Sequence, residues 1–334
     1  MITVENLSKR YGNVSAITEV SFSVARGEVL AFLGPNGAGK TTTMRILTGF
    51  VPPTSGTARV AGFDVLDQPL EVKRRIGYLP DNPPLYMEMT VGEYLAFAAK
   101  IRGVRGKAVS SARAAVLEKC GLAGMEGRLI ANLSRGYRQR VGLAQAMIHN
   151  PEVLILDEPT VGLDPKQIVE IRELIKTLGG ERTVILSTHI LPEATAVCQK
   201  VVIINKGRIV AVDAPDRLAM RTRKSEKTRL CVRRGEAVEV AAIFKIQGVT
   251  HVAPHPASPS ETDPSRAFII ESEVGTDIRE ALADTVVRAG WGLLEMQPQV
   301  ATIEDVFLQL TTQEGPIEAS SPAMPTVAPP TASQ

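Results

Sequence analysis

A glycine-rich segment near the N-terminus constrains this chain more than any other feature. It matches the pattern G-x-x-x-x-G-K-[ST] at every fixed position. An apolar run, Gly27 to Leu33, leads into it, and a helix-forming run, Lys40 to Leu47, leaves it, so the segment should connect a strand to a helix. Its residues are Gly34, Pro35, Asn36, Gly37, Ala38, Gly39, Lys40, Thr41 and Thr42.

These residue types suit the binding of a phosphate group. Glycines let the backbone turn tightly with its N–H groups facing inward, and the helix that follows directs its positive end at an anion. Lys40 can reach β- and γ-phosphates as a point charge, and the hydroxyl of Thr41 can complete a magnesium shell. The alternative is a glycine-rich turn with a chance lysine, which the strand and helix patterns on either side disfavour. The segment therefore predicts a site for a nucleoside triphosphate with Mg²⁺.

Length and composition limit the remaining possibilities. A chain of 334 residues can form two domains or one large domain with an appendage. The net charge of +2 gives no reason to expect a nucleic-acid partner. The widely spaced Cys120, Cys198 and Cys231 indicate buried thiols in a reducing compartment. The first residues do not resemble a secretion signal, and no run approaches 18 apolar residues. We therefore expect a cytoplasmic chain that does not itself cross a membrane.

Two acidic residues directly follow a continuous apolar run, Val153 to Leu156. Such a run is typical of a central parallel strand that is buried on both faces, and ligands bind at the carboxyl ends of such strands. Asp157 can hold magnesium there, and Glu158 can polarise an attacking water. Solvated acids at a strand end are the alternative, which the phosphate-binding segment on the same chain disfavours.

Two later segments carry helix-start signals. Ser134 is suited to be the N-cap of an amphipathic helix that runs to about His149, and its helix start can present N–H groups and a hydroxyl to an anion. Asp164 followed by Pro165 is typical of a second helix start.

A histidine and a tyrosine are further candidates. The buried-strand pattern Thr183–Leu186 leads into His189, which is either a structural histidine or a contact to a γ-phosphate; its place beside the acid-bearing strand favours the second interpretation. Tyr11 is either a sheet-edge tyrosine or a stacking partner for adenine, and its place ahead of the phosphate-binding segment favours stacking.

The rest of the first 220 residues alternates between strands and helices. Residues 2–24 have the polar–apolar alternation of antiparallel strands. We expect further strands at Thr57–Val60 and Ile76–Leu79, helices at Leu70–Arg75, Thr90–Ile101 and Ser111–Cys120, and a closing hairpin of Val201–Asn205 with Arg208–Asp213.

Beyond this region the pattern restarts in the order β-α-β-β-α-β, which predicts a ferredoxin-like interaction or regulatory unit. Its expected elements are Thr228–Val232, Glu236–Ile246, Val249–Val252, Ala267–Glu271, Asp277–Ala289 and Trp291–Glu295, with a last helix at Ile303–Leu310. The basic segment Arg221–Arg234 is either a contact to anionic lipid or to a partner, or, as we favour, a solvated linker. From about Gln313 the composition predicts a disordered tail.

The order of these motifs resembles the ATP-binding subunit of ABC transporters over about residues 1–215. The Leu-Ser-x-Gly signature at Leu133–Gly136, shortly before the acid-bearing strand, is the most specific part of the resemblance. The later unit, including Glu304–Phe307, resembles the accessory domain of the drug-exporter and gliding-motility types. The implied fold is an α/β P-loop cassette with a mixed central sheet, an antiparallel β-subdomain and a helical insertion at about 88–147. The implied boundaries are 1–220 for the cassette, 221–312 for a smaller α+β domain and 313–334 for the tail.

The resemblance implies roles for residues within one copy. Tyr11 is expected to stack on adenine, and the phosphate-binding segment to hold the phosphates and Mg²⁺ of ATP. Asp157 is expected to bind the metal, directly or through water, Glu158 to act as the general base, and His189 to contact the γ-phosphate.

The resemblance also implies a site shared between copies. In that family two cassettes close head to tail around two ATP molecules, and the phosphate loop of one faces the signature of the other. Ser134 and Gly136 are then expected to complete the partner's site, and Asp164 to connect the two sites. The implied partners are a second copy of this chain, or a homologous cassette, and an integral-membrane permease.

The sequence departs from the family pattern at three positions. Asp81 stands where the family usually has glutamine; a carboxylate there can still bind Mg²⁺ or order water, but it is shorter and charged. Arg135 replaces the first of two signature glycines, and Tyr137 replaces a glutamine. Coupling to the permease and closure of the dimer are the steps on which these departures bear; because Ser134 and Gly136 are intact, we expect the cassette to be competent.

The resulting hypothesis is an ATP-hydrolysing subunit, attached peripherally to the cell membrane through a permease, that drives export. The alternative is a soluble ABC-type ATPase acting on ribosomes or DNA. The chain contains one cassette, and only about ninety residues separate Thr41 from Leu133. Both features favour transport. A kinase or GTPase lacks support because no base-reading or acceptor motif accompanies the phosphate-binding segment.

Overall fold

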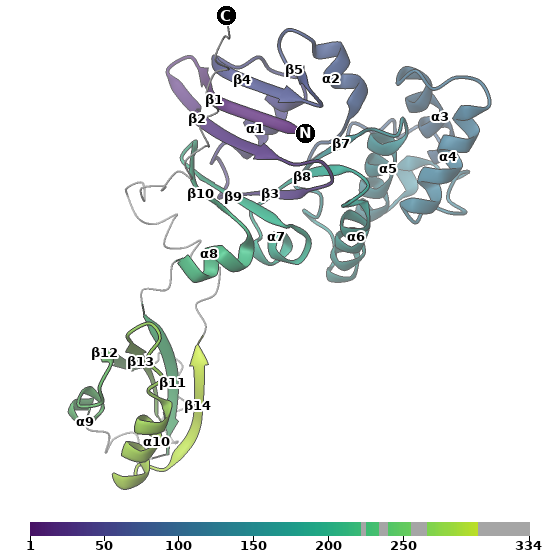
Figure 1. Cartoon of the computed structure of the whole chain (residues 1–334). Coiled ribbons are helices and arrows are strands. Elements are labelled where there is room, and N and C mark those ends of the chain that lie inside the picture. Colours follow the sequence, from purple (N-terminus) through teal and green to yellow (C-terminus); the bar gives the residue numbers. More distant parts are fainter. Residues whose placement is uncertain (222–224, 234–239, 255–265, 300–334) are drawn as a thin grey trace, which may run out of the picture.

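The computed structural model describes residues 1–221, 225–233, 240–254 and 266–299 (Figure 1). The first 221 residues contain two β-sheets with helices packed around them, and the later residues contain a third sheet. The arrangement is the mixed α/β cassette with a smaller α+β unit that the sequence predicts.

The first sheet is antiparallel and has the strand order β2-β1-β4-β5. Strand β1 lies between β2 and β4: its Ile2 pairs with Val24 of β2 on one side and with Val60 of β4 on the other. The predicted alternation over residues 2–24 is confirmed, with apolar side chains on the buried face. The strands are β1 (Ile2–Tyr11), β2 (Val14–Val24), β4 (Ser55–Val60) and β5 (Phe63–Asp64).

The second sheet carries the functional residues and has the order β10-β9-β3-β8-β7-β6. Its five strands from β9 to β6 are parallel, and β10 adds an antiparallel edge. Every residue of β3, β7 and β8 is buried, as expected for central strands covered on both faces. The strands are β3 (Val29–Leu33), β6 (Ile76–Leu79), β7 (Val153–Asp157), β8 (Thr183–Thr188), β9 (Lys200–Asn205) and β10 (Arg208–Asp213).

The alternation of side chains along the central strands divides the cassette into two hydrophobic cores. On β3, Leu30 and Phe32 pack toward the first sheet, with Met44 of α1 (Lys40–Leu47) between the two sheets. Ala31 and Leu33 point to the opposite face, where helices cover the sheet. The helix α1 is therefore held between two sheets, with its N-terminus at the carboxyl end of β3.

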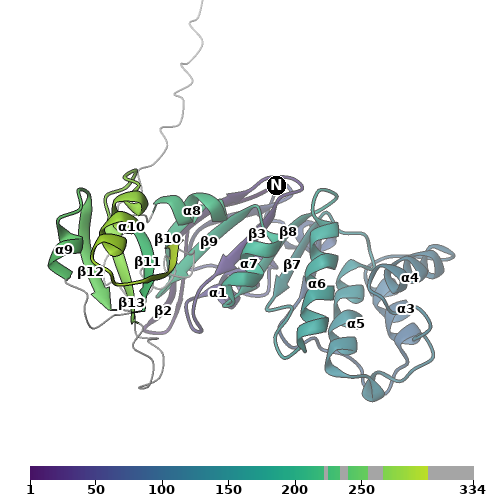
Figure 2. The same cartoon turned by 90° about the horizontal axis from the view of Figure 1, so that it is seen from below.

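The helical insertion comprises α3 (Val91–Ile101), α4 (Ala108–Lys119) and α5 (Arg135–Met147), which lie together at one end of the cassette (Figure 2). The predicted capping box at the start of α3 is present, because Thr90 and Glu93 bond to each other's backbone N–H groups. The other helices of the cassette are α2 (Pro69–Arg75), α6 (Pro165–Leu178), α7 (Leu191–Val197) and α8 (Pro215–Arg221), with a 3₁₀ turn at Ile130–Asn132.

The third sheet has the order β12-β13-β11-β14 and is antiparallel throughout. Two helices connect its strands in the β-α-β-β-α-β sequence, so the predicted ferredoxin-like arrangement is present. Its separate core includes Leu230, Ile270 and Leu282. The elements are β11 (Glu226–Val232), α9 (Val240–Phe244), β12 (Val249–Pro254), β13 (Arg266–Ser272), α10 (Arg279–Arg288) and β14 (Leu293–Gln299).

The predicted start of the last strand is wrong. Trp291 lies outside any strand, between Gly290 and Gly292, which have φ values of 69° and 72°, and β14 begins only at Leu293. The indole is buried in the core of this unit, so it is held by packing and not by strand pairing. The predicted helix Ile303–Leu310 and the predicted tail lie outside the described residues.

The cysteines only partly match the expectation. Cys120 and Cys198 are buried, and burial raises the pKa of the Cys120 thiol to about 12, whereas Cys231 is half-buried. Within the described residues, none of the helices combines the length and the apolar character that crossing a bilayer requires.

Candidate nucleotide-binding site

The predicted phosphate-binding segment forms the turn between β3 and α1. Gly39, the N-cap of α1, has a φ of 109°, and a Cβ there would lie 2.8 Å from the carbonyl oxygen of Ala16. At Gly34 a Cβ would lie only 2.4 Å from the carbonyl oxygen of Ile204. The backbone therefore passes too close to its neighbours for any side chain at these two positions, so only glycine fits there.

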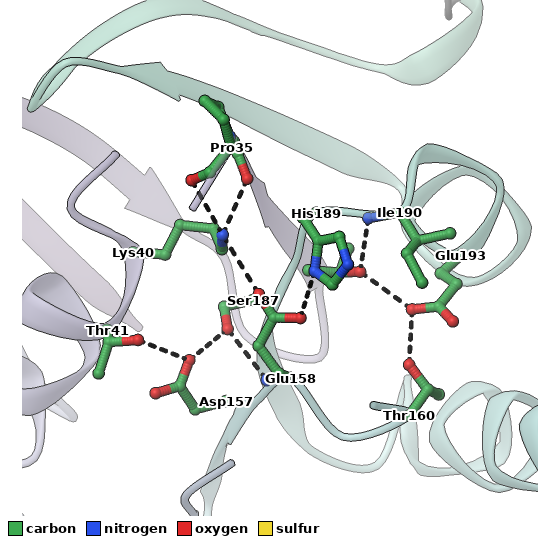
Figure 3. A network of polar contacts seen from close by, with 12 residues as sticks. Pro35, Lys40, Thr41, Asp157, Glu158, Thr160, Ser187, His189, Ile190 and Glu193 are labelled. Carbon is green, nitrogen blue, oxygen red and sulfur yellow. Dashed lines mark hydrogen bonds and ion pairs between the residues drawn. The ribbon is translucent and has the colours of Figure 1, made fainter. Parts of the chain in front are cut away.

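Lys40 lies at the centre of the site and is almost fully buried. Its Nζ donates to the carbonyl oxygens of Gly34 at 2.8 Å and Pro35 at 3.3 Å (Figure 3). The same atom lies 3.2 Å from Oε1 of Glu158. The ammonium group is thus directed across the mouth of the turn toward the acid that ends the central strand.

The other carboxylate, Asp157, is 1% exposed at the end of β7. Its Oδ1 accepts hydrogen bonds from Ser187 Oγ at 2.5 Å and Thr41 Oγ1 at 3.4 Å. Burial raises the pKa of Asp157, and the neighbouring carboxylates of Glu158 and Asp81 raise it further.

This donor set fits a hard divalent cation. A carboxylate, a threonine hydroxyl and a second carboxylate are the oxygen ligands that Mg²⁺ prefers, and a cation would compensate the buried charge of Asp157. Thr41 and Asp157 come together here although 116 positions separate them in the sequence. Asp81 lines the same pocket.

The predicted histidine reaches the same place from the next strand. His189 follows β8, and its Nδ1 lies 2.7 Å from Oε2 of Glu158 (Figure 3). The backbone of Glu158 has a φ of 50°, a conformation that non-glycine residues seldom adopt. Its N–H donates to both the carbonyl oxygen and the hydroxyl of Ser187, at 3.2 and 3.1 Å. Lys40 and His189 therefore hold the side chain of Glu158, and its carboxylate can accept a proton in this position.

Lys40, Glu158 and His189 line a pocket of about 340 Å³. The structure brings together in it most of the residues predicted for one copy, and adds Ala16 and Val161. The lining residues are Ala16, Asn36, Gly37, Gly39, Lys40, Thr41, Thr42, Asp81, Glu158, Val161 and His189.

Tyr11 does not line this pocket. It ends β1, where it pairs with Val14 in the adjacent strand, and it is 47% exposed. The Nζ of Lys9 lies 5.2 Å from the centre of its ring. An exposed aromatic face at a strand end is compatible with both alternatives for this residue.

Ser134, Gly136 and Asp164 lie together at a second location, formed by the starts of α5 and α6. The hydroxyl of Ser134 accepts from the N–H of Tyr137 at 3.4 Å, and Oδ1 of Asp164 accepts from the N–H of Gln167 at 2.9 Å, so both predicted N-caps are confirmed. A Cβ at Gly136 would lie 2.2 Å from Oε1 of Gln167.

Arg135, which departs from the family pattern, also lies at this second location. The guanidinium of Arg135 lies against Gly162 in the loop that precedes α6: a Cβ at Gly162 would be 2.3 Å from the Arg135 Cζ. Arg135 is exposed. The arginine therefore connects the start of α5 to the loop that follows Glu158.

Sequence reasoning missed three residues that shape the site. Ser187 hydrogen-bonds to both Asp157 and Glu158, and Thr160 and Glu193 form a buried contact behind His189. The one available signal for Ser187 is its place at a strand end next to His189. Glu193 carries no sequence signal, because its helix α7 is too short to show an apolar period.

Comparison with known proteins agrees with this geometry. The family model described as "ABC transporter" matches residues 17–161. An uncharacterized ABC transporter ATP-binding protein, YxlF of Bacillus subtilis, is 34% identical over 93% of this chain and 99% of its own length. The bacitracin transport ATP-binding protein BcrA of Bacillus licheniformis is 41% identical over 67% of this chain and 73% of its own length. The daunorubicin resistance ATP-binding protein DrrA3 of Streptomyces coeruleorubidus is 32% identical over 93% of this chain and 95% of its own length.

Solved structures give the same result. One titled as the ATP-binding subunit of an ABC transporter has a TM-score of 0.61 and 32% identity, and it covers 66% of this chain and 92% of its own. A second, titled as a dimeric bacterial ABC transporter cassette, MJ0796, has a TM-score of 0.59 and 25% identity. It covers 64% of this chain and 98% of its own.

The fold and the pocket together define a P-loop nucleoside triphosphatase. Similarity to YxlF along nearly the whole of both chains assigns the family: this chain belongs to the ABC transporter ATP-binding proteins. It is an ATPase whose hydrolysis is coupled to transport.

Proposed function

We propose that ATP is hydrolysed between two cassettes, each a copy of this chain or a homologue, and that their closure drives a separate membrane permease. The observation that carries the proposal is the division of the predicted site into two locations. The pocket around Lys40 holds the phosphate-binding and acidic residues, whereas Ser134, Gly136 and Asp164 are at the starts of α5 and α6. A site that needs both groups is completed by a second copy, and the solved cassette with a dimeric title supports this arrangement.

Within one copy, the turn from Gly34 to Thr42 would hold the phosphates of ATP. Thr41, Asp157 and Asp81 would hold Mg²⁺, which supplies positive charge to the phosphate oxygens when bound. Tyr11 would stack on adenine.

Glu158 would act as the general base. A triphosphate carries more negative charge than one carboxylate, so it competes with Glu158 for the ammonium group of Lys40. Glu158, still held by His189, then takes a proton from the water that attacks the γ-phosphorus. The bond from that phosphorus to the bridging oxygen breaks, and ADP leaves. His189 would also contact the γ-phosphate.

The transported compound would leave the cell. Support comes from the relatives named for bacitracin transport and daunorubicin resistance, the second of which matches both chains almost completely. The protein would then be cytoplasmic and attached to the membrane through its permease. Ribosomes, DNA and other nucleic acids are not expected partners.

Cross-linking tests the shared site. We suggest Ser134→Cys on one copy and Asn36→Cys on the other, both carrying Glu158→Gln to slow hydrolysis, with the half-buried Cys231 changed to serine in each. A disulfide between copies that forms with MgATP and not with ADP is the expected result. Ser110→Cys paired with Asn36→Cys is the matched control and should remain uncross-linked. Failure of the first pair to cross-link under any nucleotide condition would refute a shared site.

A second experiment tests coupling to a permease. The chain should pellet with membranes only when its permease is co-expressed, and a membrane protein should co-purify with it. Association with ribosomes or DNA in the absence of membrane protein would support the alternative instead.

A further inference from the structure

The buried carboxylate of Glu193 is not among the residues that line the pocket, and the proposed hydrolysis does not use it. Glu193 is on the first turn of α7 and is 3% exposed. Its Oε2 accepts from Thr160 Oγ1 at 2.6 Å and from Thr188 Oγ1 at 2.9 Å (Figure 3). Its Oε1 lies 3.4 Å from Nη2 of Arg172 on α6. A buried carboxylate is costly unless it is compensated in this way, so the three partners are what keep it in place.

The two hydroxyl partners belong to the two segments that carry Glu158 and His189. Thr160 lies two positions after Glu158, and Thr188 lies immediately before His189. Both threonines are buried, so water does not replace their hydrogen bonds to Glu193. One carboxylate oxygen therefore joins the loop after β7 to the end of β8.

The segment after β7 needs such support. The backbone of Glu158 has a φ of 50°, and a conformation of this kind persists only where its surroundings over-determine it. On one side, Ser187 accepts two hydrogen bonds from the Glu158 N–H. On the other side, the next anchored side chain is that of Thr160, which is held by Glu193.

We propose that Glu193 is a positioning residue that sets the spacing between Glu158 and His189 through Thr160 and Thr188. The inference rests on the proposed role of Glu158 as general base. With the bridge intact, Glu158 Oε2 lies 2.7 Å from His189 Nδ1. Without the bridge, the two segments stay joined through Ser187 but lose the contact beyond it, so the spacing of the Glu158 and His189 side chains is no longer held from that side, while the residues of the phosphate turn keep their own contacts.

The test removes one hydroxyl and leaves the fold in place. Thr160→Val keeps the shape of the side chain but loses the bond to Glu193, and Thr160→Ser keeps the hydroxyl. Thr195→Val is the matched control, because the Thr195 hydroxyl bonds to the backbone of its own helix, at Leu191 and Pro192. Steady-state ATP hydrolysis by the full chain, with urea unfolding of each variant, gives the readout.

A positioning role predicts a split between the kinetic constants. For Thr160→Val, kcat should fall roughly tenfold, as expected for one lost hydrogen bond to a buried charge, while KM for MgATP stays within about threefold. Thr160→Ser and Thr195→Val should stay within about threefold of the unmodified chain in both constants.

Three results would overturn the inference: an unchanged kcat in Thr160→Val, a rise in KM alone, or a serine variant as slow as the valine variant. The failure of the proposed function looks different. In that case Glu158→Gln would hydrolyse ATP as fast as the unmodified chain, whatever Thr160→Val does.

Discussion

The ammonium group of Lys40 lies 3.2 Å from Oε1 of Glu158, and both side chains are nearly buried. The two charges compensate each other, which is why both side chains can be nearly buried. In the proposed mechanism each residue leaves the pair, because Lys40 would hold phosphate and Glu158 would accept a proton. The binding of a triphosphate and the release of the base would then be linked through this one contact.

Replacing the carboxylate of Glu158 separates binding from hydrolysis. Glu158→Gln keeps the size of the side chain and a contact to Lys40 but cannot take the proton. We expect ATP binding to be retained and hydrolysis to fall by roughly 10²-fold or more. Equilibrium binding of a fluorescent ATP analogue and phosphate release would measure the two effects. Hydrolysis at the unmodified rate would exclude Glu158 as the base.

Removing the cation affects both binding and stability. Lys40→Ala takes away the proposed phosphate contact and leaves the carboxylate of Glu158 without its buried cationic neighbour. We expect ATP binding to be lost and the free energy of unfolding to fall by about 1–3 kcal/mol.

A double variant separates these two effects of Lys40. Adding Glu158→Gln to Lys40→Ala removes the uncompensated charge, so stability should recover while ATP binding stays absent. Urea unfolding and ATP binding measured on all three variants complete the comparison. Equal stabilities of the single and double variants would contradict the electrostatic explanation.

A tight contact holds α5 against the central sheet. A Cβ at Gly77 on β6 would lie 2.1 Å from the carbonyl oxygen of Ala146 on α5, and a backbone atom cannot move aside as a flexible side chain can. Gly77→Ala should therefore lower the free energy of unfolding by about 3 kcal/mol. Gly127→Ala is the control, because nothing lies within 4 Å of a Cβ there. Urea unfolding of both variants tests this, and equal stabilities would contradict it.

Acidification should destabilise the cassette through His149. Burial, reinforced by Arg102, lowers the pKa of His149 to about 4 from its ordinary 6.5, while Nε2 lies 3.1 Å from the carbonyl oxygen of Ile76. Between these two pH values the unfolded chain binds a proton that the folded chain does not. Stability from this group is therefore complete above pH 6.5 and is lost as the pH falls toward 4, by up to about 3 kcal/mol.

The variant His149→Gln isolates this contribution. Its amide can still donate to Ile76 but does not titrate, so its stability should depend less on pH between 6.5 and 4. Urea unfolding at several pH values, for the variant and the unmodified chain, measures the difference. Parallel pH profiles would contradict the assignment to His149.

Much of the site was predictable because many of its residues lie in short, contiguous sequence motifs. The phosphate turn, the acids after Val153–Leu156 and the helix starts at Ser134 and Asp164 each depend on residues within a few positions of one another. The structure confirms the turn and both N-caps. The roles of these residues in hydrolysis stay predictions.

Other features could not be read from short patterns. The predicted strand included Trp291, but the positive φ values of the two glycines beside it interrupt the extended backbone, and the strand begins only at Leu293. The helix α7 has seven residues, too few for an apolar period, so Glu193 had no predicted position.

By itself, the sequence determined that this chain has a phosphate-binding turn, a buried strand ending in two acids, and a family whose members hydrolyse ATP. Those features are local, because backbone conformation and side-chain periodicity act over a few residues. Only the tertiary structure decided which distant residues meet: Thr41 with Asp157, Lys40 and His189 with Glu158, and Thr160 and Thr188 with Glu193. The physical reason is that parallel strands far apart in the chain end at the same edge of one sheet, and the packing of both faces sets the distances there.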